Sequence, residues 1–117
     1  MGQFAQIPND TLRDRTLSYL ARGLLAEALS HVEGWRHDGA EAIWRRAREA
    51  RGEAAESRRV IQAAVAELEL HGYRHRLRWR DADGELRNEI RYCATAAKCG
   101  DQRCLTCPDL PGLVTRE

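Results

Sequence analysis

The sequence predicts a mostly helical α+β fold: a three-helix core, then a two-stranded β-hairpin and a cysteine-rich tail. Apolar residues recur at helical spacing in three successive segments. After the third segment the pattern changes to strict alternation, and an Asp-Gly turn signal divides the alternating stretch in two. All four cysteines follow, between Cys93 and Cys107. We therefore divide the chain into a globular domain over residues 1–92 and a tail over residues 93–117.

Two helices are predicted over about residues 16–31 and 39–50, after a short opening segment. In the first, one apolar stripe runs through three turns: Leu17, Leu20, Ala21, Leu24, Leu25, Ala28 and Leu29. In the second, the inner face consists of Ala40, Ile43, Trp44 and Ala47. Its outer face carries Arg45, Arg46 and Arg48.

A third helix is predicted over residues 57–71, and Gly72 ends it, because glycine tolerates the left-handed conformation found after helix ends. The residues expected to face the core are Val60, Ile61, Ala64, Val65 and Leu68. The residues of its exposed first turns are polar: Ser57, Arg58, Arg59 and Gln62.

The alternating stretch predicts a hairpin with one apolar and one basic face. Tyr73, His75, Leu77 and Trp79 fall on the first face, and the even-numbered residues from Arg74 to Arg80 on the second. A tight turn at Asp83-Gly84 would set Leu77 opposite Ile90 and Arg78 opposite Glu89. Apolar would then face apolar and charge would face opposite charge, which favours this register.

Three helices followed by a hairpin are the order of a winged helix-turn-helix, whose third helix enters the major groove of DNA. Arginine forks suit guanine and glutamine suits adenine, so we expect base contacts from Ser57, Arg58, Arg59 and Gln62. Phosphate or minor-groove contacts are expected from Arg45, Arg76, Arg78, Arg80 and Arg87. The competing interpretation is an ordinary solvated surface, with Arg78 simply paired to Glu89.

The overall charge neither demands nor excludes this interpretation. The formal net charge is only +1, but residues 74–80 contain four arginines and no acid. No apolar run approaches the roughly 20 residues that a membrane span needs, and no signal-peptide pattern opens the chain. We therefore expect a cytoplasmic protein. No phosphate loop, carboxylate pair or Ser/His/Asp arrangement predicts an enzyme.

The cysteines predict a metal site. Their clustering in a reducing compartment favours metal over disulfides. Cys104 and Cys107 have the two-residue gap that lets both thiolates reach one ion, and Cys93 and Cys99 would complete a tetrahedral zinc site. An iron–sulfur cluster, a redox disulfide or four reduced thiols are the alternatives. His71 and His75 flank Gly72-Tyr73, and we expect both to lie outside the metal site.

Several segments resemble a known family. The segments that carry the resemblance are Phe4-Ala5-Gln6-Ile7-Pro8-Asn9, Leu17-Ser18, Ala21-Arg22-Gly23-Leu24-Leu25-Ala26, Leu29-Ser30, Gly34-Trp35, Ala64-Val65-Ala66-Glu67-Leu68 and Gly72-Tyr73. Over residues 4–92 the chain is similar to small winged helix-turn-helix proteins of actinobacterial chromosomes, plasmids and phages, which are related to phage replisome organisers. The tail lies outside this resemblance.

The resemblance implies a bacterial, nucleoid-associated DNA-binding protein. One short domain offers few base contacts, so a homodimeric transcriptional regulator is the first hypothesis. A replication or partition accessory protein that binds origin DNA is the second. The third is a protein-interaction adaptor that uses the same fold and whose tail docks a protein partner.

Overall fold

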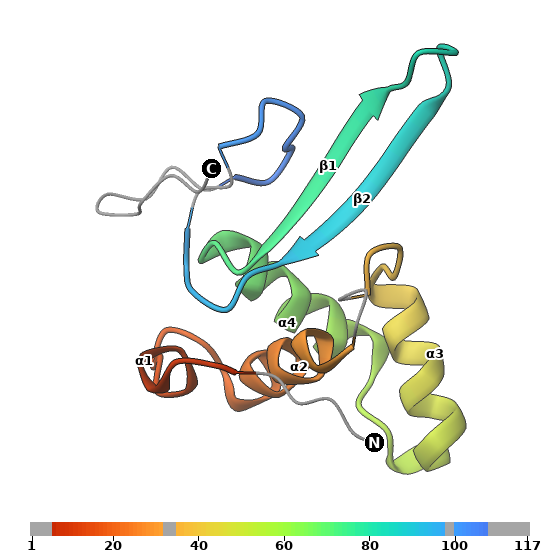
Figure 1. Ribbon diagram of the computed structural model, residues 1–117. Coiled ribbons are helices and arrows are strands. Elements are labelled where there is room, and N and C mark those ends of the chain that lie inside the picture. Colours follow the sequence, from red (N-terminus) through yellow and green to blue (C-terminus); the bar gives the residue numbers. More distant parts are fainter. Residues whose placement is uncertain (1–5, 32–34, 98–99, 108–117) are drawn as a thin grey trace, which may run out of the picture.

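The protein, described here by a computed structural model over residues 6–31, 35–97 and 100–107, has an α+β fold (Figure 1). The elements are α1 (Asn9–Leu12), α2 (Tyr19–Ser30), α3 (Ala40–Arg51), the 3-10 turn η1 (Gly52–Ala54), α4 (Arg58–Leu70), β1 (Arg74–Arg80) and β2 (Leu86–Tyr92). The hairpin β1–β2 projects away from the helices (Figure 1). The α+β class is thus confirmed, and the order of elements is compatible with a winged helix.

The core lies between the three long helices, where α4 packs against both α2 and α3. It collects the predicted stripes together with Trp35 and Tyr73: Leu17, Ala21, Leu24, Leu25, Ala28, Ile43, Ile61, Ala64, Val65 and Leu68. Val60 is an exception, because its side chain is 47% exposed. It precedes Ile61 by about 100° around the helix and so lies beyond the edge of the buried stripe. The inward placement predicted for Val60 is therefore wrong.

The limits of α4 follow from its local sequence. Ser57 is the N-cap, and its Oγ accepts a hydrogen bond from the Val60 amide at 3.2 Å. At the other end Gly72 has φ +85°, a conformation that glycine adopts without strain. The Tyr73 amide then donates to the Leu68 carbonyl at 2.8 Å, which closes the helix end. The strand β1 therefore begins directly after the helix, as the change of periodicity predicted.

The hairpin register differs by one residue from the predicted register. Leu77 faces Glu89 and Arg78 faces Asn88. The cause is the loop, which has three residues between Asp81 and Glu85 rather than two. The Asp81 carboxylate accepts hydrogen bonds from the Asp83 and Glu85 amides at 2.9 and 3.0 Å, and Gly84 takes φ +79°. This is the three-residue loop in which a left-handed residue follows a tight turn.

The one-residue shift moves the β2 side chains to the opposite face, because side chains alternate along a strand. Glu89, expected beside Arg78, instead shares a face with Leu77 and is 9% exposed. Arg87, expected beside Arg80, shares a face with Trp79. The face that carries Arg76, Arg78 and Arg80, called the arginine face below, receives no acidic residue from β2. Its β2 members are Leu86, Asn88, Ile90 and Tyr92.

The described part of the tail packs on the hairpin. Residues 103–105 run antiparallel to β1 on the edge away from β2, with a bridge between Leu77 and Cys104. The Arg78 amide donates to the Arg103 carbonyl at 3.0 Å, and the Leu105 amide donates to the Arg76 carbonyl at 2.8 Å. In Figure 1 this segment lies alongside β1. None of the helices in the described ranges is long and apolar enough to span a bilayer.

Candidate nucleic-acid interface and metal group

An open groove of about 250 Å³ joins α4 to the arginine face of the hairpin. Gln62 and Arg76, which lie on different elements, both line this groove. The remaining lining residues are Gly39, Ala40, Val65, Ala66, Glu69, Arg74 and Ile90. One residue from each of the two predicted groups of DNA-contacting residues, the α4 group and the hairpin group, therefore lies on one concave surface.

At the start of α4 the four predicted base-contacting residues have different environments. Ser57 caps the helix. The Arg58 guanidinium stacks over the Trp44 ring at 4.3 Å and lies 3.2 Å from a Glu41 carboxylate oxygen, so it ties α4 to α3. Arg59 and Gln62 are exposed, and no side-chain hydrogen bond or ion pair joins either of them to the described part of the chain. These two side chains are the ones available to a ligand.

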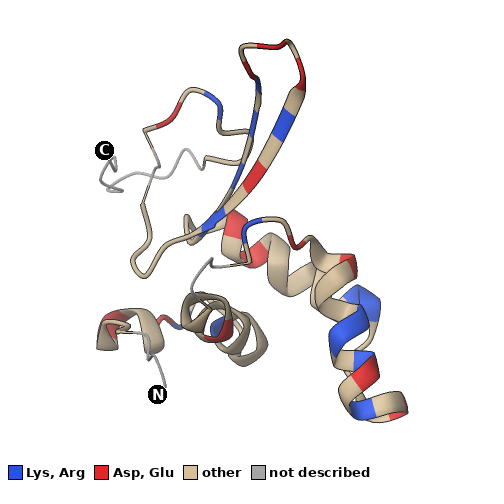
Figure 2. Cartoon of the chain, turned by 45° about the vertical axis from the view of Figure 1, so that its right-hand side comes forward, with Lys and Arg blue, Asp and Glu red and all other residues tan. Residues whose placement is uncertain are grey.

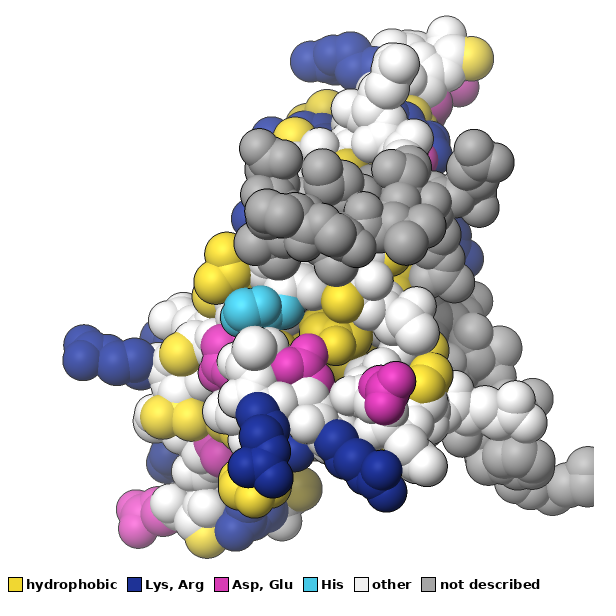
Figure 3. Space-filling model, turned by 90° about the vertical axis from the view of Figure 1, so that its left-hand side faces the viewer, with side chains coloured by type: hydrophobic (Ala, Val, Ile, Leu, Met, Phe, Trp, Pro, Cys, Tyr) yellow, Lys and Arg dark blue, Asp and Glu magenta, His cyan; other side chains and the backbone are white. Residues whose placement is uncertain are grey.

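Further arginines lie along α3. The Arg45 side chain is 71% exposed, and its contact with Glu41, one turn before it, is long at 4.0 Å. Figure 2 shows basic residues gathered along this helix, with few acidic ones between them. On the face seen in Figure 3, by contrast, basic, acidic and apolar side chains of the described residues are mixed. The basic character of the protein is therefore local, which agrees with its formal net charge of +1.

On the hairpin, the predicted arginines separate into two groups. Arg76 lies 3.1 Å from Glu69, Arg78 donates to the Asn88 side chain at 3.1 Å, and Arg80 donates to the Gly84 carbonyl at 2.8 Å. Arg87 is on the opposite face and lies 2.8 Å from Asp81. Arg87 therefore lies near the hairpin tip, as expected, but on the other face from Arg76, Arg78 and Arg80.

Where the hairpin meets α4, charged residues are paired. Arg74 is 2% exposed, forms an ion pair with Glu69 and donates to the Tyr92 hydroxyl at 2.9 Å. Behind the hairpin, Glu89 accepts hydrogen bonds from Arg36 at 2.6 Å and from Arg91 at 2.7 Å. Burial raises the pKa of Glu89, but these hydrogen bonds outweigh burial and hold the pKa below its usual value. Glu89 therefore keeps its charge and stabilises the middle of the hairpin from its rear face.

His75, Cys104 and Cys107 form a group that could hold a metal ion. Their ligand atoms all lie within 4.8 Å of one another, and Nδ1 of His75 is 3.8 Å from Sγ of Cys104. The exclusion of His75 from the metal site, predicted from the sequence, is thus corrected. His75 is fully buried, as a core histidine would be, but the tail brings Cys104 against it.

The other two predicted ligands lie elsewhere. Cys93 is 4% exposed, follows β2 directly and donates its amide hydrogen to the Tyr73 carbonyl at 2.8 Å. It does not belong to the group formed by His75, Cys104 and Cys107. Cys99 lies outside the described residues. Among the four predicted ligands, only Cys104 and Cys107 are therefore brought together in the described part of the chain.

Two residues were not predicted in their observed places: His75, which was excluded as a metal ligand, and Asn88, which lies on the arginine face. For His75 the available signal was its position on the apolar face of β1, the face that a tail would cover. Its contact with Cys104 joins distant parts of the chain. For Asn88 there was no signal, because its face depends on the hairpin register.

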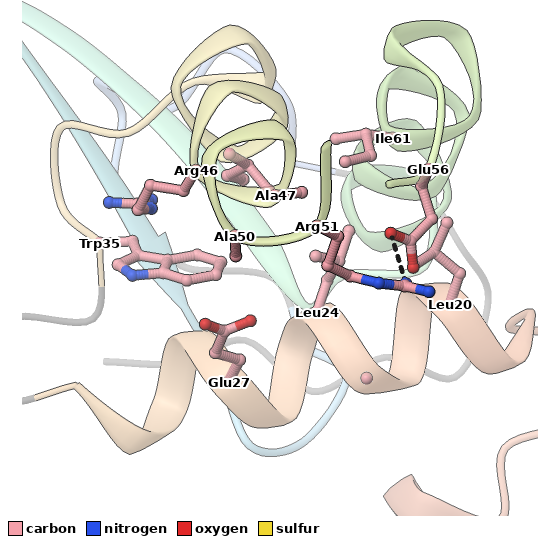
Figure 4. A pocket seen from close by; sticks show the side chains of 12 residues that line it. Leu20, Leu24, Glu27, Trp35, Arg46, Ala47, Ala50, Arg51, Glu56 and Ile61 are labelled. Atoms are coloured by element: carbon pink, nitrogen blue, oxygen red, sulfur yellow. Dashed lines mark hydrogen bonds and ion pairs between the residues drawn. The ribbon is translucent and has the colours of Figure 1, made fainter. Parts of the chain in front are cut away.

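A second hollow, of about 420 Å³, lies between α2, α3 and α4 (Figure 4). Leu20, Leu24 and Ile61 are among its apolar walls, and Arg51 at its rim lies 3.4 Å from Glu56. It contains no histidine or cysteine among its lining residues. Charged side chains of Glu27 and Arg46 share the lining of this hollow with the apolar ones.

The chain was compared with protein-family models, curated proteins and solved structures. No family model, no curated protein and no solved structure matches the chain.

Proposed function

We propose that the protein binds double-stranded DNA, with α4 in the major groove and the arginine face of the hairpin against the sugar–phosphate backbone. The observation that carries the proposal is the shared groove, in which Gln62 of α4 and Arg76 of β1 line one surface. A winged helix-turn-helix uses the same combination of a recognition helix and a hairpin beside it.

The exposed row of α4 has suitable chemistry for base reading. Arg59 carries a guanidinium fork for the acceptors of guanine, and Gln62 carries the amide that pairs with adenine. One turn further along, Ala66 is exposed and small, so the helix can approach the base edges closely. Ser57 and Arg58 lie at the helix start, where hydroxyl, guanidinium and backbone amides favour phosphate.

The hairpin has suitable electrostatics for phosphate. Arg78 and Arg80 are hydrogen-bonded to neutral acceptors, and β2 contributes no acid to their face. Arg76 shares Glu69 with buried Arg74, so the acid is already neutralised from within the protein. Exposed ion pairs are weak, so Arg45 can exchange the Glu41 carboxylate for phosphate at little cost. When Arg76 turns to phosphate, Glu69 keeps Arg74 as its partner.

Binding-site selection from random duplex DNA, followed by fluorescence anisotropy on the selected sequence, tests the proposal. Arg59→Ala should weaken binding to the selected site by about 1–3 kcal/mol and leave random DNA almost unaffected. Arg48→Ala, on α3, is the matched control for removing one positive charge. No enrichment of any sequence, together with no affinity for random DNA, would refute DNA binding and leave the adaptor hypothesis.

The genomic position of the selected sequence then separates the two DNA-binding roles. Single sites at promoters support a transcriptional regulator, which is the role we propose, in a bacterial cytoplasm. Arrays of repeats at an origin support a replication or partition protein. Palindromic half-sites support a homodimer, because operator symmetry reflects protein symmetry.

For the metal group we propose zinc as the ion. Two thiolates and one imidazole are a typical zinc donor set, whereas iron–sulfur clusters are held mainly by cysteines. Metal analysis of the purified protein tests the identity: one equivalent of zinc and a colourless solution support it, and a brown iron-containing protein contradicts it.

A further inference from the structure

His75 is oriented as a metal-binding histidine should be. Its Nε2 lies 3.1 Å from the carbonyl oxygen of Gly72. A carbonyl can only accept, so Nε2 carries the proton, and the lone pair of Nδ1 points towards Cys104. A metal-binding histidine usually donates a hydrogen bond from the ring nitrogen that does not bind the metal, because this bond fixes both the tautomer and the ring orientation.

The two thiols come from a segment that is already registered against the same strand. The Leu77–Cys104 bridge places Cys104 at the outer edge of β1. The Arg76 amide donates to the Thr106 hydroxyl at 2.9 Å, between the two cysteines. The two residues between Cys104 and Cys107 give the spacing at which both thiolates reach one ion.

The same tail segment covers the rear of the hairpin, which is the face opposite the arginine face. The Arg103 guanidinium stacks over the Trp79 ring at 4.4 Å, and Asp101 lies 3.6 Å from Arg91. Both Trp79 and Arg91 lie on the face that carries Leu77 and Glu89. Residues 100–107, the described end of the tail, therefore support the hairpin from behind and do not cover the arginine face.

We propose that Nδ1 of His75 and the thiolates of Cys104 and Cys107 bind one zinc ion, and that this ion fastens residues 101–107 to the rear of the hairpin. The ligand set differs from four cysteines, because a residue of the hairpin itself provides one ligand. A two-stranded hairpin is marginal by itself, and a short tail has no core of its own. The ion supplies the free energy that holds both together.

This zinc site, called the zinc clamp below, rests on the proposed function only in its expected effect on DNA binding. If the arginine face contacts DNA, then the clamp holds that face in position, and loss of zinc should weaken the hairpin contacts while α4 stays folded. Zinc binding and hairpin protection are measured without DNA. Failure of the clamp and failure of DNA binding are therefore distinguishable.

The test uses zinc affinity and amide hydrogen exchange on the full chain. Cys107→Ser should weaken zinc binding by more than about tenfold, since even partners outside the ligand shell change affinity by about 10–100-fold. His75→Ala should do the same, and Cys107, which is exposed, provides the variant that leaves the core intact. His71→Ala is the matched control, because His71 flanks Gly72 but lies outside the group.

Hydrogen exchange shows whether the ion acts as a clamp. Chelation should speed exchange of the Arg78 and Leu105 amides, which hold the tail to β1, and leave the Tyr73 amide at the helix end unchanged. Cobalt(II) substitution should give thiolate-to-metal absorption in wild type and in His71→Ala, and lose it in Cys107→Ser. Undiminished zinc affinity of Cys107→Ser, or unchanged exchange at Arg78 and Leu105 after zinc removal, would overturn the proposal.

Discussion

Two arginines of the hairpin, Arg78 and Arg87, provide a direct test of which face meets DNA. They lie on neighbouring strands and have similar charge, but the register places them on opposite faces. Arg78 lies on the arginine face beside Asn88, and Arg87 lies on the rear face beside Trp79 and binds Asp81. Arg78→Ala should therefore weaken DNA binding and Arg87→Ala should not.

The magnitude follows from counterion release. One lost phosphate contact should reduce the slope of log K against log salt by about 0.9. Over a fourfold rise in salt, from about 50 to about 200 mM, wild type should lose about 3.5-fold more affinity than Arg78→Ala. Fluorescence anisotropy titrations at several salt concentrations measure both slopes, with circular dichroism as the check that each variant is folded. Equal slopes for Arg78→Ala and wild type, or a reduced slope for Arg87→Ala, would refute the assignment of faces.

Three further predictions concern stability, measured by urea unfolding. Ser57→Ala should lower the free energy of unfolding by about 1 kcal/mol, because the Ser57 hydroxyl no longer accepts the hydrogen bond from the Val60 amide at the start of α4. Leu68→Ala should cost about 2–5 kcal/mol because Leu68 is fully buried, whereas Leu70→Ala, at an exposed position two residues on, should stay within about 0.5 kcal/mol of wild type. Glu89→Gln should have a lower free energy of unfolding than wild type at neutral pH. This difference in free energy should shrink as pH falls below about 4.5, because the pKa of Glu89 is depressed in the folded state and its stabilising effect disappears on protonation. If the difference in free energy of unfolding between Glu89→Gln and wild type does not change with pH, the charged Glu89 carboxylate is not the stabilising form.

The helical part could be predicted because it depends on local patterns. The buried stripe Ile61, Ala64, Val65 and Leu68 follows directly from helical periodicity. Ser57 and Gly72 set the ends of α4 by a side-chain cap and a left-handed residue. In each case residues within about five positions of one another determine the result.

The register of the hairpin could not be predicted, because it depends on which turn Asp81 forms. The Asp-Gly pair favours a two-residue turn, but the Asp81 carboxylate binds two amides across a three-residue loop. That single difference moved Glu89 and Arg87 to the rear face. The predicted cross-strand partner of Arg78, Glu89, was therefore wrong, even though both strands were predicted correctly.

The metal group was predicted in part for a related reason. The spacing of Cys104 and Cys107 is a local signal, and both belong to the group. His75 lies 29 residues before Cys104 in the chain, and only the path of the tail along β1 brings them within 3.8 Å. Periodicity placed His75 on an inward face, but could not say that the tail would cover that face.

An amide NMR titration with the selected duplex tests the DNA interface most directly. Shift changes should concentrate on the exposed row of α4, at Arg59, Gln62 and Ala66, and on Arg76, Arg78 and Arg80 of the hairpin. The rear-face residues Trp79, Arg87 and Arg91 should change little. Changes concentrated on the rear face and the tail, with α4 unaffected, would contradict DNA binding through α4 and the arginine face.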